Sequence, residues 1–236
     1  MERDGFLVDC DELNRLGAQY DQQIAELKDE IFSLCGVAPF NLNSPQQLGR
    51  VLYDTLGLPA KKKTARGYST DAETLNELAE LHPAVDKILL YRQVAKLKST
   101  YIAGLLRLRG RAGRIHTWSD QTIAATGRIS SSEPNLQNIP VRTPMGREIR
   151  RAFIAPAGSV LVDADYSQIE LRLLAHLSGD EAMCEAFTLG QDIHARTAAE
   201  VYGVPLDEVT PQMRSSAKAV NFGIVYGISD FGLAAN

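Results

Sequence analysis

Apolar residues in the first part of the chain recur every three or four positions, which is the period of an amphipathic helix. Between Leu13 and Leu34 they mark one face of a long helix, which begins at the capping-box-like pair Asp9 and Glu12 and ends at Gly36. This face is therefore expected to lie in a core.

Three further helices are predicted before residue 110. A short one begins at Ser44-Pro45, a second begins at Thr70 or Asp71, and a long one covers residues 84–108. Two long helices with short ones between them predict a helical unit of roughly 110 residues, a typical size for a small domain.

After residue 110, short apolar runs separated by turn residues predict strands. Four such runs are expected to form two antiparallel hairpins, with residues 114–118 and 121–125 in the first and residues 151–155 and 160–165 in the second. The polar segment 126–140 between the hairpins is rich in amide and hydroxyl groups. It is expected to be a loop, and loops on rigid scaffolds often carry binding residues.

Asp165 lies where the pattern changes from strand to helix. Residues 159–164 form a β-branched apolar run, whereas Ile169, Leu173 and Leu177 recur every four residues. A carboxylate at the end of a rigid strand is held in place and open to solvent, so it is suited to binding a hard cation. The alternative is that Asp165 only caps the helix that follows.

The last part of the chain is predicted to be helical. Two helices over residues 181–189 and 192–202 precede a third that begins at Thr210-Pro211. Together with the strands before them, these helices predict a fold of the α+β class.

The last predicted helix places two cations and two aromatic residues on one slanted stripe. Arg214, Lys218, Phe222 and Tyr226 follow one another at four-residue steps. This set suits a nucleoside triphosphate, because cations bind its phosphates and a ring stacks on its base. Asp165 is then a candidate ligand for the cation that accompanies the triphosphate. The alternative is a helix with a solvated basic start and a buried aromatic end.

The composition, with 44% apolar and 23% charged residues, is typical of a soluble globular protein. No apolar run is long enough to span a membrane and no signal peptide opens the chain, so we expect a cytoplasmic protein without a membrane partner. Cys10, Cys35 and Cys184 lack metal-site spacing and fit reduced thiols.

The net charge of −4 is unevenly distributed along the chain. Residues 1–36 hold nine acidic and three basic side chains, whereas residues 87–119 hold eight basic side chains and no acidic ones. Such a basic stretch indicates contact with nucleic acid, although a solvated basic face explains it nearly as well. The basic loop at residues 61–67 has two similar interpretations, phosphate contact or a mobile surface segment.

Three long motifs stand out in this order: T-G-R-I-S-S-S-E-P-N-L-Q-N-I-P at 126–140, D-Y-S-Q-I-E-L-R at 165–172 and R-S-S-A-K-A-V-N-F-G-I-V-Y-G at 214–227. Together they resemble family-A DNA polymerases of the bacterial DNA polymerase I type. K-L-K-S-T-Y at 96–101 and the opening M-E-R-D-G-F-L-V-D extend the resemblance over essentially the whole chain. The chain is thus similar to the N-terminal part of a polymerase domain.

The resemblance implies a right-hand polymerase fold of which the chain supplies a helical thumb, part of an antiparallel palm sheet and the start of helical fingers. Residues 1–115 would be mainly thumb. Residues 116–180 would be the palm portion with the first catalytic carboxylate, and residues 181–236 would begin the fingers with the nucleotide-binding helix.

The activity that the resemblance implies is template-directed DNA synthesis, for replication and repair. A DNA-directed DNA polymerase adds deoxynucleoside triphosphates to a primer 3′ end and releases pyrophosphate. The implied partners are therefore primer-template DNA and deoxynucleoside triphosphates, and the complete enzyme is expected to be a monomer.

The resemblance also implies roles for individual residues. Asp165 and the Tyr166 carbonyl would bind Mg²⁺, with two ions in the complete enzyme. Lys218 would also protonate the leaving group, and Glu170 would lie where a ribose 2′-hydroxyl would clash. The implied nucleotide-binding residues are Gln168, Glu170, His194, Arg214, Lys218, Phe222 and Tyr226.

DNA contacts are implied for the polar loop and for the basic helix. Minor-groove acceptors occur on every base pair, so hydrogen-bond donors from the loop can test pair geometry without reading sequence. Lysines on the helix would add salt-sensitive phosphate contacts. The implied DNA-binding residues are Lys96, Lys98, Arg128, Asn135, Gln137 and Asn138.

One part of the family pattern is missing from this sequence. The family has a second catalytic carboxylate in a later His-Asp-Glu type motif, and no such motif follows Tyr226. One carboxylate makes a weak Mg²⁺ site, so we expect these 236 residues to be inactive alone and, with an incomplete palm, marginally stable. Two other interpretations are a non-catalytic DNA-binding fragment and a single-subunit RNA polymerase, which shares an R-x-x-x-K helix.

Overall fold

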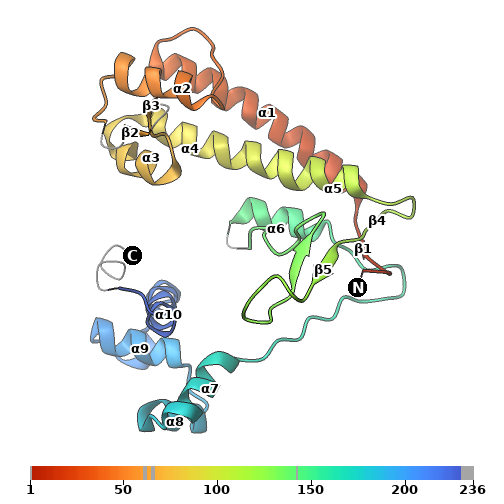
Figure 1. The fold of residues 1–236 in the computed structure, drawn as a ribbon, viewed down its shortest axis with the longest axis vertical. Helices are drawn as coiled ribbons and strands as arrows, with labels where there is room; N and C mark the ends of the chain where they lie inside the picture. Colours follow the sequence, from red (N-terminus) through yellow and green to blue (C-terminus); the bar gives the residue numbers. More distant parts are fainter. Residues whose placement is uncertain (1, 61–62, 65–66, 142, 230–236) are drawn as a thin grey trace. The chain divides into compact units, whose positions relative to one another are not determined.

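The computed structural model describes residues 2–60, 63–64, 67–141 and 143–229. The chain divides into two compact units, unit 1 (Met1–Leu161) and unit 2 (Val162–Asn236). Both are built mainly from helices, and the strands form only small antiparallel sheets (Figure 1).

Two long helices form the frame of unit 1 and pack side by side (Figure 1). Helix α1 (Cys10–Cys35) begins at Asp9, whose carboxylate accepts a hydrogen bond from the first turn. Helix α4 (Pro83–Lys96) continues through the π-helical segment η3 (Leu97–Ile102) into α5 (Ala103–Leu108). Both long helices predicted from the sequence are therefore confirmed.

The other helices of unit 1 are short. Ser44 and Asp71 cap two of them through their side chains, as the sequence predicted. These helices are α2 (Pro45–Gly49), the π-helical η1 (Arg50–Thr55), α3 (Ala72–Leu78), the 3₁₀ helix η2 (Ala79–Leu81) and α6 (Pro144–Arg151).

The apolar faces of α1 and α4 meet in the core of unit 1. Leu16 and Ile31 of α1 and Val85 and Ile88 of α4 are all fully buried. Burying a side chain of this size contributes roughly 1.5–3 kcal/mol relative to leaving it in water. This face of α1 is the one that its apolar spacing marked.

Arg92 of α4 is half-buried in unit 1 and not on a solvated basic face. Its guanidinium donates hydrogen bonds to the carbonyl oxygen and, at 3.3 Å, to the hydroxyl of Thr70. Burial lowers the pKa of Arg92. These bonds hold the start of α3 against α4, so Arg92 does not contribute to an exposed basic surface.

Three two-stranded antiparallel sheets occur among the described residues. They pair β1 (Phe6–Leu7) with β4 (Arg114–Ile115), β2 (Lys63–Thr64) with β3 (Gly67–Tyr68), and β5 (Trp118–Asp120) with β6 (Ser130–Ser132). The first predicted hairpin is thus wrong in its pairing, because residues 114–118 divide between two sheets and residues 121–125 form no strand. Of the predicted basic loop at residues 61–67, residues 61–66 lie outside the residues whose side chains are described.

The second predicted hairpin is not formed. Helix α6 takes up residue 151, and in the run 151–155 Phe153 makes only an isolated bridge to Val8. Residues 160–165 form neither helix nor strand, and Val162 is 84% exposed. Strand propensity alone does not make a strand, because the backbone groups need a partner, and none of the described residues supplies one here.

Unit 2 is a cluster of helices. Asp180, Asp192 and Thr210 cap three of them through their side chains, and the sequence predicted Thr210 as a cap. The helices are α7 (Ile169–Ser178), α8 (Glu181–Thr188), α9 (Ile193–Tyr202), the 3₁₀ helix η4 (Leu206–Glu208) and α10 (Pro211–Val225). No helix in the described ranges is both long and apolar enough to cross a lipid bilayer.

The core of unit 2 is small. It centres on Leu171, Ala186 and Ile193, with Met183 and Phe187 packed against it. The four-residue repeat that predicted α7 is largely solvent-exposed, since Ile169, Leu173 and Leu177 are exposed by 42%, 53% and 81%. The spacing therefore identified the helix but not its buried face.

Candidate functional site

The chain turns sharply before α7. Gln168 occupies the N-cap position with a φ of 54°, in the left-handed region that non-glycine residues rarely adopt, and its side chain makes no capping bond. Asp165 is exposed and lies in the irregular segment before this turn. Both predictions for its local setting are therefore wrong: Asp165 neither ends a strand nor caps α7.

Asp192 joins the start of α9 to α10. Its Oδ1 accepts hydrogen bonds from the backbone N–H groups of His194 at 2.9 Å and Ala195 at 3.1 Å. Its Oδ2 accepts two from Arg214, from Nε at 3.0 Å and from Nη2 at 2.6 Å. Burial alone would raise the pKa of Asp192, but the hydrogen bonds from Arg214 and the backbone lower it, so the carboxylate stays charged.

The predicted stripe on α10 is present as a row of contacting side chains. The Nζ atom of Lys218 lies 5.8 Å from the centre of the Phe222 ring. The Phe222 and Tyr226 rings are nearly parallel, 14° apart, with their centres separated by 6.0 Å. The Tyr226 hydroxyl donates to Glu170 Oε2 at 2.7 Å, so the stripe reaches the first turn of α7.

His194 is the most buried polar residue of this region, with 2% of its surface exposed. Its ring lies 5.6 Å from that of Phe222, centre to centre. Burial lowers the pKa of His194, Asp192 opposes this change, and the positive charges of Arg214 and Lys218 lower the pKa further. The imidazole is therefore neutral at neutral pH.

These side chains surround one cavity of about 280 Å³. Both carboxylates of the predicted site, Asp165 and Glu170, line the same cavity as the two cations. Tyr226 adjoins it through Glu170. The lining residues are Asp165, Tyr166, Gln168, Ile169, Glu170, His194, Arg214, Lys218 and Phe222. Unit 2 thus brings its predicted site residues together, and their roles stay predictions.

Gln168 contributes an unusual feature to the cavity. Its Oε1 atom is buried and has no hydrogen-bond partner among the described residues. A buried acceptor without a donor costs about 1–3 kcal/mol. This cost falls at the turn before α7, where Gln168 also has its unusual φ.

The predicted DNA-binding residues all belong to unit 1. Lys98 forms an ion pair with Asp21. Gln137 holds the polar loop together, since its Oε1 accepts from Ser131 N at 3.1 Å and its Nε2 donates to the carbonyl of Ile129 at 2.5 Å. Part of the predicted donor set is therefore already used to shape the loop.

The other predicted loop residues are also placed by internal bonds. Asn135 Oδ1 accepts from the backbone N–H groups of Gln137 at 3.0 Å and Asn138 at 3.2 Å. The Tyr101 hydroxyl donates to the carbonyl of Asn138 and so ties the loop to η3. Arg128 and Lys96 are exposed. The loop is thus held by internal bonds and leaves the Arg128 side chain at the surface, and Lys96 is exposed at the end of α4.

No group of three or more His, Cys, Asp or Glu side chains in the described parts of the chain is arranged to hold a metal ion. Asp165 and Tyr166 line the cavity, and a carboxylate and a backbone carbonyl are oxygen ligands of the kind that Mg²⁺ takes. Mg²⁺ commonly binds one or two carboxylates and completes its shell with water and substrate phosphate. The donors fit in kind and supply part of such a shell.

Sequence reasoning missed two residues of this region. The sequence marked Asp192 only as the start of a helix, and its contact with Arg214 depends on α10 lying against α9. Asn221 contacts both His194 and Thr197, but no spacing rule singles out an asparagine inside a helix. Both contacts join residues more than twenty positions apart, so the sequence pattern does not reveal them.

Comparisons with known proteins cover almost the whole chain. Residues 10–236 match the family model for DNA polymerase family A. DNA polymerase I of Bacillus subtilis (strain 168) is 53% identical over 238 residues, which are 100% of this chain and 27% of that protein. The thermostable DNA polymerase I of Thermus aquaticus is 56% identical over 97% of this chain and 28% of that protein. The chain thus spans little more than a quarter of these relatives.

A solved structure gives the same result for the fold. It is the POL domain of Pol1 from M. smegmatis in complex with DNA primer-template and dNTP, and it matches with a TM-score of 0.87 and 46% sequence identity. The match covers 98% of this chain and 41% of that one. Sequence and fold agree, and the chain belongs to DNA polymerase family A.

Proposed function

We propose that this chain is the part of a DNA-directed DNA polymerase that binds the incoming deoxynucleoside triphosphate and contributes the first catalytic carboxylate. The observation that carries this proposal is the cavity in unit 2, where Arg214, Lys218 and His194 face the same space as Asp165 and Glu170. Cations, a neutral ring donor and carboxylates in one cavity suit a triphosphate that arrives with a divalent cation.

In this proposal α9 and α10 hold the phosphates. Arg214 is oriented by Asp192 through Nε and Nη2, which leaves its other N–H groups for a phosphate. Lys218 adds a second positive charge one turn further along and donates a proton to the leaving pyrophosphate. Phe222 offers a ring face for the sugar or base.

Glu170 and Tyr226 are proposed to select deoxyribose. The 2.7 Å hydrogen bond from the Tyr226 hydroxyl fixes the Glu170 carboxylate at the edge of the cavity. A ribose 2′-hydroxyl at that position would clash with the Glu170 side chain, which this hydrogen bond holds in place. This arrangement favours DNA synthesis over the single-subunit RNA polymerase interpretation, and equal use of ribonucleotides and deoxynucleotides by the longer enzyme would contradict it.

Asp165 and the Tyr166 carbonyl would hold Mg²⁺, with two ions in the complete enzyme. The ions would lower the pKa of the primer hydroxyl and neutralise charge on the phosphates. Asp165 itself would position this cation at the triphosphate end of the cavity. The substrate phosphates would supply the further oxygen ligands that this chain lacks.

We assign unit 1 to the DNA in the same proposal. Residues 1–115 would be mainly thumb, 116–180 the palm portion and 181–236 the start of the fingers. Lys96, Lys98 and the polar loop with Arg128, Asn135, Gln137 and Asn138 would contact primer-template DNA. The solved relative carries DNA primer-template and dNTP, which supports both partners.

A nucleotide-binding experiment tests the proposal on this chain. We expect the 236 residues to bind dATP with Mg²⁺, measured by titration calorimetry, and Arg214→Ala to weaken binding at least tenfold. Arg196→Ala is the matched control, because Arg196 lies on neighbouring α9, pairs with Glu185 at 3.5 Å and lines a different cavity. Equal losses in both variants, or no binding by the unmodified chain, would reject the proposed site.

A primer-extension assay tests the catalytic part. These 236 residues supply one of two carboxylates, so we propose that they bind primer-template without extending it. In that outcome the non-catalytic DNA-binding description applies to this polypeptide alone. Extension that disappears in Asp165→Ala would show that the chain holds a complete metal site, and the inactivity proposal would be wrong.

A further inference from the structure

His194 is held in one orientation by its neighbours. It lies in the first turn of α9, and its Nδ1 atom is 3.1 Å from Nδ2 of Asn221 on α10. The ring also packs against Phe222. Because Nδ1 already has this partner, Nε2 is the ring nitrogen left for a ligand in the cavity that His194 lines.

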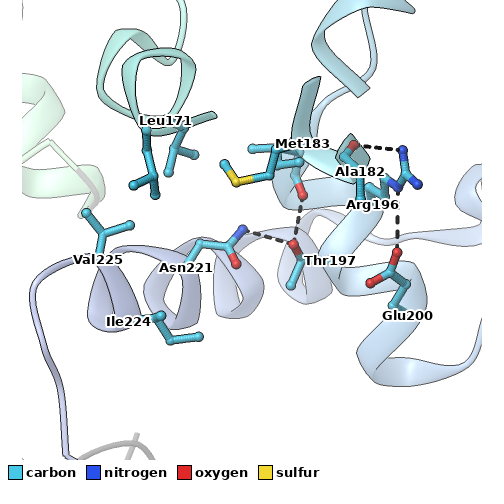
Figure 2. Close-up of a pocket in the computed structure, with 11 residues that line it drawn as sticks. Leu171, Ala182, Met183, Arg196, Thr197, Glu200, Asn221, Ile224 and Val225 are labelled. Atoms are coloured by element: carbon cyan, nitrogen blue, oxygen red, sulfur yellow. Dashed lines mark hydrogen bonds and ion pairs between the residues drawn. The ribbon is translucent and has the colours of Figure 1, made fainter. Parts of the chain in front are cut away.

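The direction of the hydrogen bonds around Asn221 follows from a backbone carbonyl. The Ile193 carbonyl can only accept, so Thr197 Oγ1, at 2.9 Å, donates its single hydrogen there. Asn221 Nδ2 lies 3.0 Å from the same Oγ1 and must therefore donate to its lone pair. Figure 2 shows the Asn221 amide pointing at Thr197 with this bond drawn.

The second hydrogen of the Asn221 amide is then available for His194. It points to Nδ1 at 3.1 Å, which makes Nδ1 an acceptor. If the Asn221 side-chain amide were turned by about 180°, its carbonyl oxygen would lie against the Thr197 hydroxyl, whose only hydrogen is already donated to the Ile193 carbonyl. That arrangement brings two lone pairs together, so the chain of bonds has one favourable direction.

We propose that Asn221, supported by Thr197, is a positioning residue that keeps His194 in the tautomer with its proton on Nε2. The ring then presents a neutral N–H donor to the bound ligand. That the ligand is a triphosphate rests on the proposed function, whereas the tautomer follows from the hydrogen bonds alone.

The charges that face His194 give this tautomer its importance. Asp192 lies at the start of the same helix, and Arg214 and Lys218 face the ring from α10. With two cations beside it and little exposed surface, the ring is uncharged at neutral pH. An uncharged imidazole donates from one nitrogen only, so the wrong tautomer would turn a lone pair towards phosphate oxygens and repel them.

Nitrogen NMR of the imidazole rings tests the tautomer without any nucleotide. The 236-residue chain has four histidines, and loss of one signal set in His194→Gln assigns His194. At neutral pH we expect Nε2 to show the shift of a protonated nitrogen and Nδ1 that of an unprotonated one. A protonated Nδ1, or an even mixture of tautomers, would overturn the proposal.

Substitutions at Asn221 and Thr197 test the cause. Asn221→Asp replaces the amide donor with a group of the same shape that only accepts, so the proton should move to Nδ1. Asn221→Ala should give a mixture. Thr197→Ser keeps the hydroxyl and should preserve the tautomer, whereas Thr197→Val should weaken the preference. Unchanged tautomers in Asn221→Asp and Thr197→Val would show that the bonds do not set the proton position.

Titration with dATP and Mg²⁺ separates this inference from the proposed function. We expect Asn221→Asp to bind the nucleotide about tenfold more weakly than the unmodified chain, as for a lost hydrogen bond to a charged group. Unchanged binding with a reversed tautomer would overturn the inference and leave the function in place. If the unmodified chain does not bind nucleotide, the function fails, and the NMR spectrum alone decides the tautomer.

Discussion

At the scale of single residues, the site depends on side chains that each make two kinds of contact. Asp192 is the clearest example, because one carboxylate oxygen caps α9 and the other holds Arg214. The ion pair is partly exposed, with 43% of the Arg214 and 35% of the Asp192 side chain accessible, so its contribution to stability is small. Its main effect is to orient the guanidinium.

Two substitutions at Asp192 separate these contacts. Asparagine is also a good cap, so Asp192→Asn should keep the helix start and lose the ion pair, with less than about 1 kcal/mol lost in stability. Asp192→Ala loses the cap as well and should cost roughly 1–2 kcal/mol. Both variants should weaken nucleotide binding alike. Urea unfolding and calorimetric titration measure the two effects, and tight binding by Asp192→Asn would contradict the orienting role.

His194 predicts a pH dependence of stability for unit 2. Burial lowers its pKa from the ordinary 6.5, so between 6.5 and the lower folded value the unfolded chain binds more protons than the folded one. Stability should therefore fall as the pH drops below about 6.5 and level off below the folded pKa. Urea unfolding between pH 8 and pH 5 measures this. His194→Gln should flatten the curve, and an identical slope in that variant would assign it to other groups.

At the scale of elements, helices were more predictable than strands for a physical reason. A helix satisfies its backbone within one segment, so caps such as Asp9, Asp71 and Thr210 and the apolar spacing mark it locally. A strand needs a partner elsewhere in the chain. The run 160–165 has strong strand propensity but no partner among the described residues, and β1 pairs with β4 from more than a hundred residues away.

The part of the candidate site that lies within one helix was predictable from the sequence, and the part that depends on contacts between helices was not. The stripe on α10 follows from four-residue spacing within one helix, and it is present in the structure. The contacts of Asp192 and Asn221 depend on how α9 and α10 pack, and the sequence pattern does not indicate the partner of either side chain. The local sequence therefore predicts a helix and the residues along one of its faces, whereas the contacts of Asp192 and Asn221 depend on how the helices pack.

Helix α6 offers a sharp test of packing at a glycine. A Cβ atom added to Gly146 would lie 2.4 Å from the carbonyl oxygen of Pro140, at the end of the polar loop. Gly146→Ala should therefore lower the free energy of unfolding by roughly 1–3 kcal/mol, because the backbone at Pro140 or Gly146 must move. Gly104 in α5 is the matched control, since an added Cβ there would meet its nearest atom at 3.9 Å. Gly104→Ala should be neutral or stabilise by up to about 1 kcal/mol in thermal unfolding, and equal effects would contradict the packing argument.

At the scale of the whole molecule, the two units have very different cores. Unit 1 buries a continuous set of side chains from α1, α4 and their neighbours, whereas the core of unit 2 centres on Leu171, Ala186 and Ile193. Free energy of unfolding depends mainly on buried apolar area, so the units should differ in stability. The proposed nucleotide-binding residues lie in unit 2, the unit that we expect to be less stable, where a bound ligand would add the most to local order.

Unfolding in urea should therefore occur in two steps, with unit 2 first. The single tryptophan, Trp118, belongs to unit 1, and His194 belongs to unit 2, so the indole and imidazole NMR signals report one unit each. The helix content measured by circular dichroism should begin to fall at the urea concentration at which the folded-state NMR signal of His194 disappears. The folded-state signal of Trp118 should persist at that concentration. Ile193→Ala should move only the first step and Leu16→Ala only the second, each by roughly 2–5 kcal/mol. A single coincident transition for both signals would show instead that the two units unfold as one cooperative body.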